Sequence, residues 1–470
     1  MVQIDTKSQH TIKSLFNAPL EYNDVIHYFD THWQTTTNLK AISQLDEAFQ
    51  FPSKKLTIAT ISGTSGKSIT MHYTSKILQE DGLKVGMFYS PHILSYNERF
   101  VINDEQISNQ MLTQLANQVL MMVDSKNIQA NTKDILTMIA LLYFQEQGVM
   151  LALLENSGTY NLDPVLYCHP QIIAVSRIVA NVSTDDTHAA LTNIIAPLTP
   201  ATHFVCADQN KQNLQIMHQL IESKGGYWAM PIRKLAPLAY PFEQLHGRCA
   251  ALAERIAHIF NDNFLNTHTK NVTPLSLLSK PKGLRGRPTL EAKKASQEIS
   301  ENSLELFWNK TTPTLPYRFQ LIEKAKNQSV LLDVADSIDA LDNLFLGFRL
   351  LAYKREFLSV SLIIGLHEHQ YNELELIKQL RHFTKKTLGI IAFCPIKKSL
   401  NEKINPSWDA QKVALLAKNL KIKAKLYKNL DEALTAAQAV QSDKNGLIII
   451  TGSQAIVSEY ITHHNTDTTL

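Results

Sequence analysis

Apolar residues recur along the chain in two alternating patterns. Short runs rich in β-branched residues predict buried strands, whereas longer segments with apolar residues three or four positions apart predict amphipathic helices. After amphipathic helices in the first fifty residues and a turn at 51–53, the expected strands are 56–61, 85–89, 150–154 and 172–176, and the expected helices are 69–80, 108–123 and 135–145. This alternation predicts an α/β protein whose mostly parallel sheet is covered on both faces.

A second α/β pattern fills the last third of the chain. Its expected strands are 330–333, 357–365, 388–393 and 446–451, and its expected helices are 338–353, 374–383, 409–419 and 430–442. We therefore expect a larger N-terminal domain over residues 1–300 and a smaller Rossmann-like domain over 315–470. The polar tail 463–470 is expected to fray.

The segment from about 261 to 314 interrupts the alternation. Its residues 280–288 are basic and rich in turn-forming Pro and Gly. Such a composition is typical of a solvated, flexible excursion, and a lid that contacts an anionic substrate is the second interpretation. The sequence therefore does not choose between these two roles for the basic segment within 264–313.

Composition narrows the function classes. Among 470 residues, 46 Lys and Arg face 43 Asp and Glu, so the formal charge of +3 gives no reason to expect nucleic acid as a partner. The four cysteines show no metal-ligand spacing, and we expect buried, reduced thiols. The N-terminus lacks a signal-peptide pattern, and no apolar run is long enough to span a membrane. We expect a cytoplasmic protein without a membrane partner.

The strongest chemical signal follows the first expected strand. There the sequence reads Gly63-Thr64-Ser65-Gly66-Lys67-Ser68 and leads into a helix. Backbone N–H groups of such a loop, together with the helix N-terminus, bind phosphate oxygens, while Lys67 neutralises the β- and γ-phosphates and Ser68 supports Mg²⁺. The first glycine of the usual P-loop pattern is replaced by Ile61. The loop has instead the shorter G-T-x-G-K form.

A second segment makes the resemblance specific. Residues 89–93 read Tyr-Ser-Pro-His-Ile, and residues 95–103 read Ser-Tyr-Asn-Glu-Arg-Phe-Val-Ile-Asn. Together with the loop, they resemble the folylpolyglutamate synthase/dihydrofolate synthase family of the Mur ligase superfamily. The similarity continues at 151–155, at 316–320, at 332–335 and at the Gly452-Ser453 turn. It covers most of the chain except about 261–314.

The resemblance implies an ADP-forming amide ligase of folate biosynthesis and one-carbon metabolism, and a monomer. ATP would phosphorylate a carboxylate of dihydropteroate or a folate, and the amine of L-glutamate would attack the acyl phosphate. By position, Lys67 contacts the transferring phosphate, and Ser90 and Glu155 bind Mg²⁺. Arg318 and Asp333 contact the nucleotide. Asp163 matches an aspartate of the family's G-G-R-x-D-A-T-N segment.

Several family residues are missing. The family's E-V-G-L-G-G-R reads Glu155-Asn156-Ser157-Gly158-Thr159-Tyr160-Asn161, so its paired glycines are lost. No histidine occupies the position of its D-H pair at 179–182, and His188 lies several residues later. The lysine of the E-K-A-G-I segment is absent from 194–198, and D-G-A-H-N-P reads Asp-Val-Ala-Asp-Ser-Ile at 333–338. These changes spare the phosphate loop and the first Mg²⁺ site but remove residues of a second metal site. We therefore expect the first two sites to be retained and the second metal site to be lost. An ATP-binding pseudoenzyme and a ligase for another carboxylic acid therefore remain alternatives.

Overall fold

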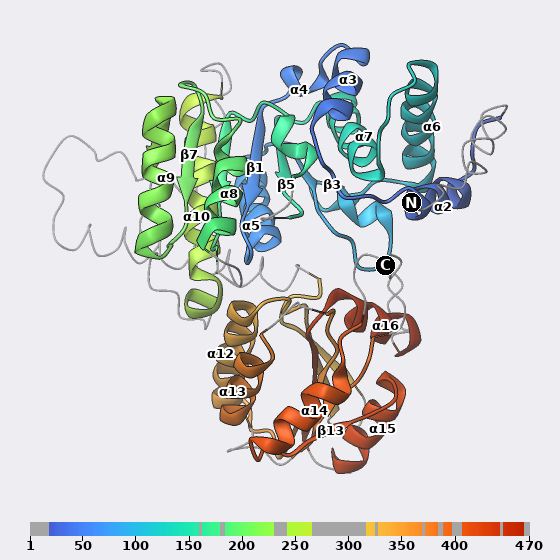
Figure 1. The fold of residues 1–470 in the computed structure, drawn as a ribbon, viewed down its shortest axis with the longest axis vertical. Coiled ribbons are helices and arrows are strands. Elements are labelled where there is room, and N and C mark those ends of the chain that lie inside the picture. Colours follow the sequence, from blue (N-terminus) through green and yellow to red (C-terminus); the bar gives the residue numbers. More distant parts are fainter. Residues whose placement is uncertain are drawn as a thin grey trace, which may run out of the picture.

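The computed structural model shows two lobes, one above the other in Figure 1. It describes residues 18–158, 162–178, 184–229, 242–265, 316–324, 328–368, 372–383, 389–396, 407–441 and 445–464. The basic segment 280–288, the stretch 179–182 and the tail beyond 464 lie outside these ranges, so the expectations for them stay untested. No described helix is long and apolar enough to cross a membrane.

The upper lobe contains an eight-stranded sheet. Its spatial order is β4-β3-β2-β5-β1-β6-β7-β8. The strands are β1 (Ile58–Ser62), β2 (Val85–Phe88), β3 (Phe100–Ile102), β4 (Glu105–Gln106), β5 (Leu151–Glu155), β6 (Ile172–Val175), β7 (His203–Cys206) and β8 (Tyr227–Ala229). The pairs β2–β3 and β3–β4 are antiparallel, and the other neighbours are parallel. The central strand β1 lies between β5 and β6, so the carboxyl ends of these three strands share one edge.

Helices cover both faces of this sheet. They are α2 (Tyr22–Thr31), α3 (Lys40–Ala48), α4 (Pro52–Lys55), α5 (Lys67–Glu80), α6 (Asn109–Ser125), α7 (Thr132–Glu146), α8 (Thr184–Ile195), α9 (Lys211–Lys224) and α10 (Phe242–Asn263), with 3₁₀ turns η1 (Tyr96–Arg99) and η2 (Pro164–Tyr167). Successive residues of β1 alternate between two cores, since Ile58 packs with α6 and α7 while Ala59 and Ile61 pack with α5 and α10. Because both faces of the sheet are covered, all five residues of β1 are buried, including the polar Thr60 and Ser62.

The lower lobe contains a six-stranded sheet of order β13-β12-β11-β14-β10-β9. Its strands are β9 (Gln320–Lys324), β10 (Gln328–Asp333), β11 (Ser359–Ile364), β12 (Ile391–Phe393), β13 (Ala424–Leu426) and β14 (Gly446–Thr451), and its helices are α12 (Ile338–Lys354), α13 (Glu373–Phe383), α14 (Ala410–Asn419), α15 (Leu430–Gln441) and α16 (Gln454–His464). Only β9 is antiparallel to its neighbour. One core lies against α12, α13 and α14, and the other against α15 and α16.

The predicted fold class, an α/β protein with two mostly parallel sheets, is confirmed. The turn expected at 51–53 is instead the start of the short helix α4, whose N-cap Phe51 has a left-handed backbone. The hairpin of β3 and β4 was not predicted, because strands of three and two residues are too short to show a period. Helix α10 was also not predicted, although it packs along α5.

Candidate nucleotide-binding site

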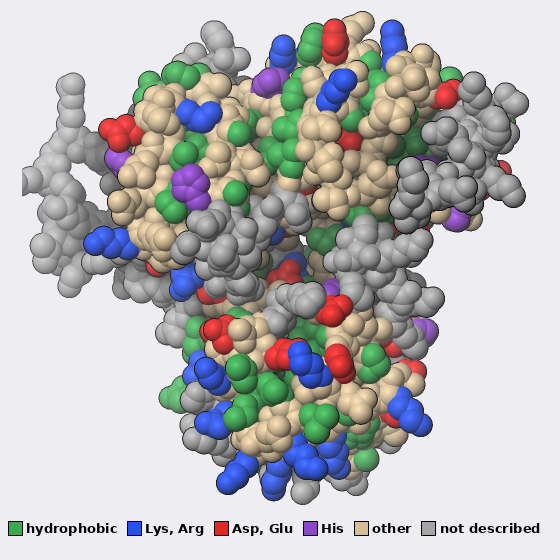
Figure 2. Space-filling view, viewed as in Figure 1, with side chains coloured by type: hydrophobic (Ala, Val, Ile, Leu, Met, Phe, Trp, Pro, Cys, Tyr) green, Lys and Arg blue, Asp and Glu red, His purple; other side chains and the backbone are tan. Residues whose placement is uncertain are grey.

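A pocket lies between the lobes, where the molecule narrows in Figure 2. The upper lobe contributes the start of α5 with its preceding loop, and the ends of β2 and β5. The lower lobe contributes the segment before β9, the segment after β10, and α12. The lining residues are Thr64, Ser65, Gly66, Lys67, Ser68, Ile69, Ser90, Pro91, Glu155, Ser157, Cys249, Arg318, Phe319, Asp333, Val334, Asp336, Ala340, Asn343, Leu344 and Gln454. The crevice at the carboxyl ends of parallel strands is the usual ligand position in such folds.

The glycine loop connects β1 to α5, as its sequence predicts. Gly63 is not among the pocket-lining residues, whereas the next five residues of the loop are. The N–H groups of Thr64 and Ser65 donate to the carbonyl oxygen of Arg177 at 2.9 and 3.3 Å. In the described part of the chain, the N–H groups of Gly66, Lys67 and Ser68 have no recorded acceptor. These three groups stand at the positive end of α5 and can bind an anion.

Both loop glycines are required by neighbouring parts of the protein. Gly63 and Gly66 have φ values of +130° and +84°, which L side chains rarely adopt. A Cβ on Gly63 would lie 2.1 Å from Ser176 Oγ, and a Cβ on Gly66 would lie 2.7 Å from Cys249 Sγ. The loop is thus closely surrounded by β6 and α10 even without a ligand.

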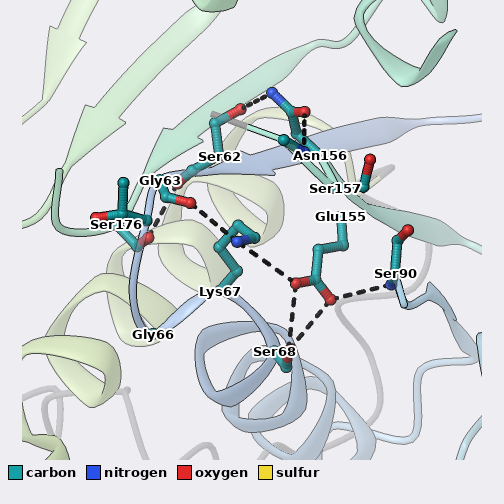
Figure 3. A network of polar contacts seen from close by, with 12 residues as sticks. Ser62, Gly63, Gly66, Lys67, Ser68, Ser90, Glu155, Asn156, Ser157 and Ser176 are labelled. Carbon is teal, nitrogen blue, oxygen red and sulfur yellow. Dashed lines mark hydrogen bonds and ion pairs between the residues drawn. The ribbon is translucent and has the colours of Figure 1, made fainter. Parts of the chain in front are cut away.

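Glu155 is the central acid of the site (Figure 3). Its carboxylate accepts hydrogen bonds from Ser68 Oγ at 3.2 and 3.3 Å and from Ser90 N at 3.3 Å, and lies 3.9 Å from Lys67 Nζ. Lys67 Nζ also donates to the carbonyl oxygen of Gly63 at 2.9 Å. Burial raises the pKa of Glu155, and the Lys67 ammonium opposes that shift. A buried carboxylate of this kind attracts a further cation.

A buried arginine lies behind Ser90. Arg99 donates from Nη1 to Ser90 Oγ at 3.0 Å and from Nε to His92 Nδ1 at 2.9 Å. Its guanidinium also lies over the rings of Trp33 and Tyr96, at 5.2 and 5.5 Å from the centroids. Burial lowers the pKa of Arg99 to about 10, which leaves it charged at neutral pH. Arg99 therefore fixes the direction of the Ser90 hydroxyl.

Two predicted nucleotide contacts come from the lower lobe. Arg318 donates from Nη1 to the carbonyl oxygen of Val334 at 3.3 Å, and Asp333 Oδ2 accepts from Phe319 N at 2.7 Å. Phe319 has a left-handed φ of 51°, so this backbone is held in a rare conformation next to Arg318. Burial raises the pKa of Asp333 to about 6, although the Arg318 charge opposes the shift. Both side chains line the pocket opposite Glu155.

Asp163 has a mainly local structural role. Its carboxylate caps η2 by accepting from Val165 N at 3.1 Å, and it accepts from both the N–H and the hydroxyl of Ser157. Lys133 Nζ lies 4.0 Å from it. His188 is exposed on α8 (Thr184–Ile195).

Sequence reasoning assigned no role to Arg99 or Arg177. Arg99 lies inside the Asn-Glu-Arg segment that carries the resemblance, so its position was a usable signal. Arg177 acts on the loop through a carbonyl oxygen, which every residue has. Only its place after the end of β6, next to β1, indicates such a contact.

The oxygen atoms around Glu155 fit Mg²⁺. The described residues contain no group of three or more His, Cys, Asp and Glu side chains that could bind a metal. Mg²⁺ in nucleotide sites commonly uses one or two carboxylates with waters and phosphates, so one buried carboxylate beside Ser68 and Ser90 is a suitable set of ligands. Zinc, which prefers Cys and His, is not suited to this set.

The fold and this pocket define a two-lobed α/β protein with a candidate nucleotide-binding site between the lobes. No family model matches the chain. Over 145 residues it is 36% identical to the dihydrofolate synthase/folylpolyglutamate synthase of Bacillus subtilis, an alignment covering 30% of this chain and 34% of that protein. The chain thus matches about a third of the length of this curated relative. Over that part, the chain is similar to folylpolyglutamate synthases/dihydrofolate synthases.

Solved structures extend the likeness of fold to almost the whole chain. Folylpolyglutamate synthase of Mycobacterium tuberculosis, complexed with ADP and AMPPCP, has a TM-score of 0.70 and 16% identity, covering 94% of this chain and 97% of that one. A bifunctional folylpolyglutamate synthase/dihydrofolate synthase with Mn, AMPPNP and L-glutamate bound has a TM-score of 0.68 and 18% identity, covering 94% and 98%. At these identities the comparison shows a shared fold.

Proposed function

We propose that the protein is an ADP-forming ligase that joins L-glutamate to dihydropteroate or to a folate. The observation that carries this proposal is the meeting of two sets of charged groups in one pocket: Lys67 and Glu155 from the upper lobe, and Arg318 and Asp333 from the lower. The relatives are named for this activity, and one structure of the same fold holds a nucleotide analogue with L-glutamate. We further propose that the two domains span residues 1–300 and 315–470.

The site can perform the steps that such a ligation needs. The N–H groups of Gly66, Lys67 and Ser68 bind phosphate oxygens, and the Lys67 ammonium stabilises negative charge on the transferred phosphoryl group. Ser90 and Glu155 would hold Mg²⁺, which supplies charge neutralisation at the phosphates when it is bound. Arg318 approaches from the other lobe and orients the nucleotide. The phosphorylated carboxylate then reacts with the amine of glutamate, releasing phosphate as the amide forms.

The pseudoenzyme alternative rests on residues that differ from the family pattern. The retained geometry favours the enzyme, because Glu155 keeps three polar neighbours suited to a metal instead of packing as an inert carboxylate. Arg318 and Asp333, as proposed nucleotide contacts, are compatible with both alternatives. The choice of acid substrate is left to the assay below.

A coupled assay for ADP release tests the proposal. Purified protein is given ATP, Mg²⁺ and L-glutamate, with dihydropteroate, tetrahydrofolate or no acid substrate. We expect ADP release that requires both the pterin acid and glutamate, and product one glutamate heavier by mass spectrometry. ATP binding without substrate-dependent ADP for any pterin acid would support the pseudoenzyme, whereas turnover with a different carboxylic acid would support the third possibility.

A further inference from the structure

Arg177 supports the phosphate loop through its backbone. Its carbonyl oxygen accepts hydrogen bonds from Thr64 N at 2.9 Å, Ser65 N at 3.3 Å and Thr64 Oγ1 at 3.0 Å. The approach is close, because a Cβ on Gly63 would lie 3.1 Å from the same oxygen. The conformation of the loop therefore depends on where the backbone of Arg177 is held.

The side chain of the same residue reaches the other lobe. Arg177 Nε lies 3.0 Å from Asp339 Oδ1, as an ion pair that is not aligned as a hydrogen bond. Asp339 is in the first turn of α12, where a negative charge is favoured by the helix dipole. Arg248 on α10 lies on the same side, with Nη1 3.8 Å from the same carboxylate oxygen. Two cations of the upper lobe thus face one anion of the lower lobe.

Asp339 directly precedes the part of α12 that forms the pocket wall. Ala340, Asn343 and Leu344 line the pocket. A contact that fixes the first turn of α12 therefore fixes the wall that faces the phosphate loop. Arg177 is then joined to both sides of the pocket, to the loop by its carbonyl oxygen and to α12 by its guanidinium.

We propose that Arg177 and Asp339 are positioning residues that couple the phosphate loop to the approach of the lower lobe. Nucleotide binding to the loop favours closure of the lobes, and closure in turn strengthens nucleotide binding, because such coupling is reciprocal. The inference rests on the proposed function only in requiring that the pocket bind a nucleotide. It assigns neither residue a contact with the nucleotide.

A simpler interpretation is a surface ion pair. The Arg177 side chain is 33% exposed and that of Asp339 16%, and exposed pairs contribute little to stability. The two interpretations differ in what the pair changes. A surface pair affects folding stability at most, whereas a coupling pair changes nucleotide affinity and lobe separation while the fold remains intact.

Nucleotide affinity is measured by calorimetry with AMPPNP and Mg²⁺ on the full chain. The variants are Arg177→Met, Asp339→Asn, their double variant and Arg177→Lys, all of which keep the carbonyl at 177. We expect each of the first two to weaken binding by about fivefold, the lower end of typical coupling. The double variant should be no weaker than Asp339→Asn alone, since that substitution already removes the contact with Arg177. Arg177→Lys should retain part of the affinity.

The matched control removes an ion pair away from the pocket. Lys412 Nζ lies 2.9 Å from Glu373 Oε1 on the lower lobe, so Lys412→Met should leave nucleotide affinity unchanged. Small-angle X-ray scattering of the nucleotide-free proteins should show a larger radius of gyration for Arg177→Met and Asp339→Asn than for the parent. Melting temperatures confirm that each variant is folded.

Parent-like affinity and parent-like scattering in folded variants would overturn the coupling. Fully additive losses in the double variant would also overturn it, because they would show independent roles. A parent protein that binds no nucleotide would instead contradict the proposed function. The scattering comparison would then decide by itself whether the pair sets the separation of the lobes.

Discussion

The substitution Glu155→Gln tests two effects of one buried charge: destabilisation of the ligand-free protein and binding of Mg²⁺ with nucleotide. Glutamine keeps the shape of the side chain and removes the charge that would bind Mg²⁺. Burial raises the pKa of Glu155 above its ordinary value, so holding the carboxylate ionised destabilises the ligand-free protein at pH values above that raised pKa. Ligand-free Glu155→Gln should therefore melt at a higher temperature than the parent at pH 8. The difference should shrink as the pH falls towards the ordinary glutamate pKa of about 4.3, where the parent also becomes neutral.

Nucleotide, in contrast, should stabilise Glu155→Gln less than it stabilises the parent. At a concentration of about 100 times Kd, a ligand stabilises the folded parent by about 2.7 kcal/mol, which raises the Tm of a domain of roughly 150–250 residues by about 5–10 °C. Contacts to a charged group contribute about 1.5–3 kcal/mol, or about 10- to 150-fold in affinity. A loss of about 100-fold would leave the ligand near its Kd. Stabilisation then falls to about 0.4 kcal/mol and the shift to about 1 °C.

Differential scanning fluorimetry measures both effects in one experiment. The parent, Glu155→Gln and a control, Glu146→Gln, are melted at pH 8 and pH 5.5 with and without AMPPNP and Mg²⁺. Glu146 is exposed at the end of α7, so its variant should follow the parent. A Glu155→Gln protein that keeps the full nucleotide-dependent shift would refute the role of this carboxylate at the metal. A lower ligand-free Tm than the parent at pH 8 would refute the argument from burial.

Three further substitutions test separate parts of the site. Arg99→Met should raise the Mg²⁺ concentration needed for half-maximal nucleotide binding by about tenfold, because Ser90 loses the donor that orients it; an unchanged Mg²⁺ requirement would contradict that role. Gly63→Ala should destabilise the fold by about 1–3 kcal/mol in urea unfolding, since the new Cβ would meet Ser176 Oγ at a left-handed φ, and near-neutral stability would contradict it. Asp333→Asn should stabilise the ligand-free protein above pH 6 and lose that advantage below about pH 4, because the folded-state pKa of Asp333 is raised to about 6; a stability gain that does not vary with pH would refute the assignment.

The strand, loop and helix around Lys67 could be predicted because their signals are local. A short β-branched run that predicts a strand is followed by a glycine loop and then by a segment with helical spacing. The strand, the loop and the helix form as predicted. The meeting of Ser90 and Glu155 with that loop could also be expected, since β2, β5 and β1 end at one edge of a parallel sheet. The resemblance supplied the expected roles of Ser90 and Glu155, and the strand order explains why they lie together.

The remaining features depend on contacts between distant segments. Arg177 supports the loop with a carbonyl oxygen, so no residue type marks that role in the sequence. The need for glycine at position 66 comes partly from Cys249 on α10, nearly two hundred residues away. The ion pair of Asp339 likewise depends on how the two lobes meet. Such features require the three-dimensional arrangement, whereas periodicity reports only on neighbours along the chain.

The central claim is that the start of α5, with Lys67, binds the phosphates of a nucleotide between the lobes. Titration calorimetry of AMPPNP with Mg²⁺ into the parent and into Lys67→Met tests it most directly. We expect one nucleotide bound per chain by the parent and binding at least about tenfold weaker in the variant, since a charged contact to phosphate is removed. No binding by the parent, or equal binding by both proteins, would contradict the claim.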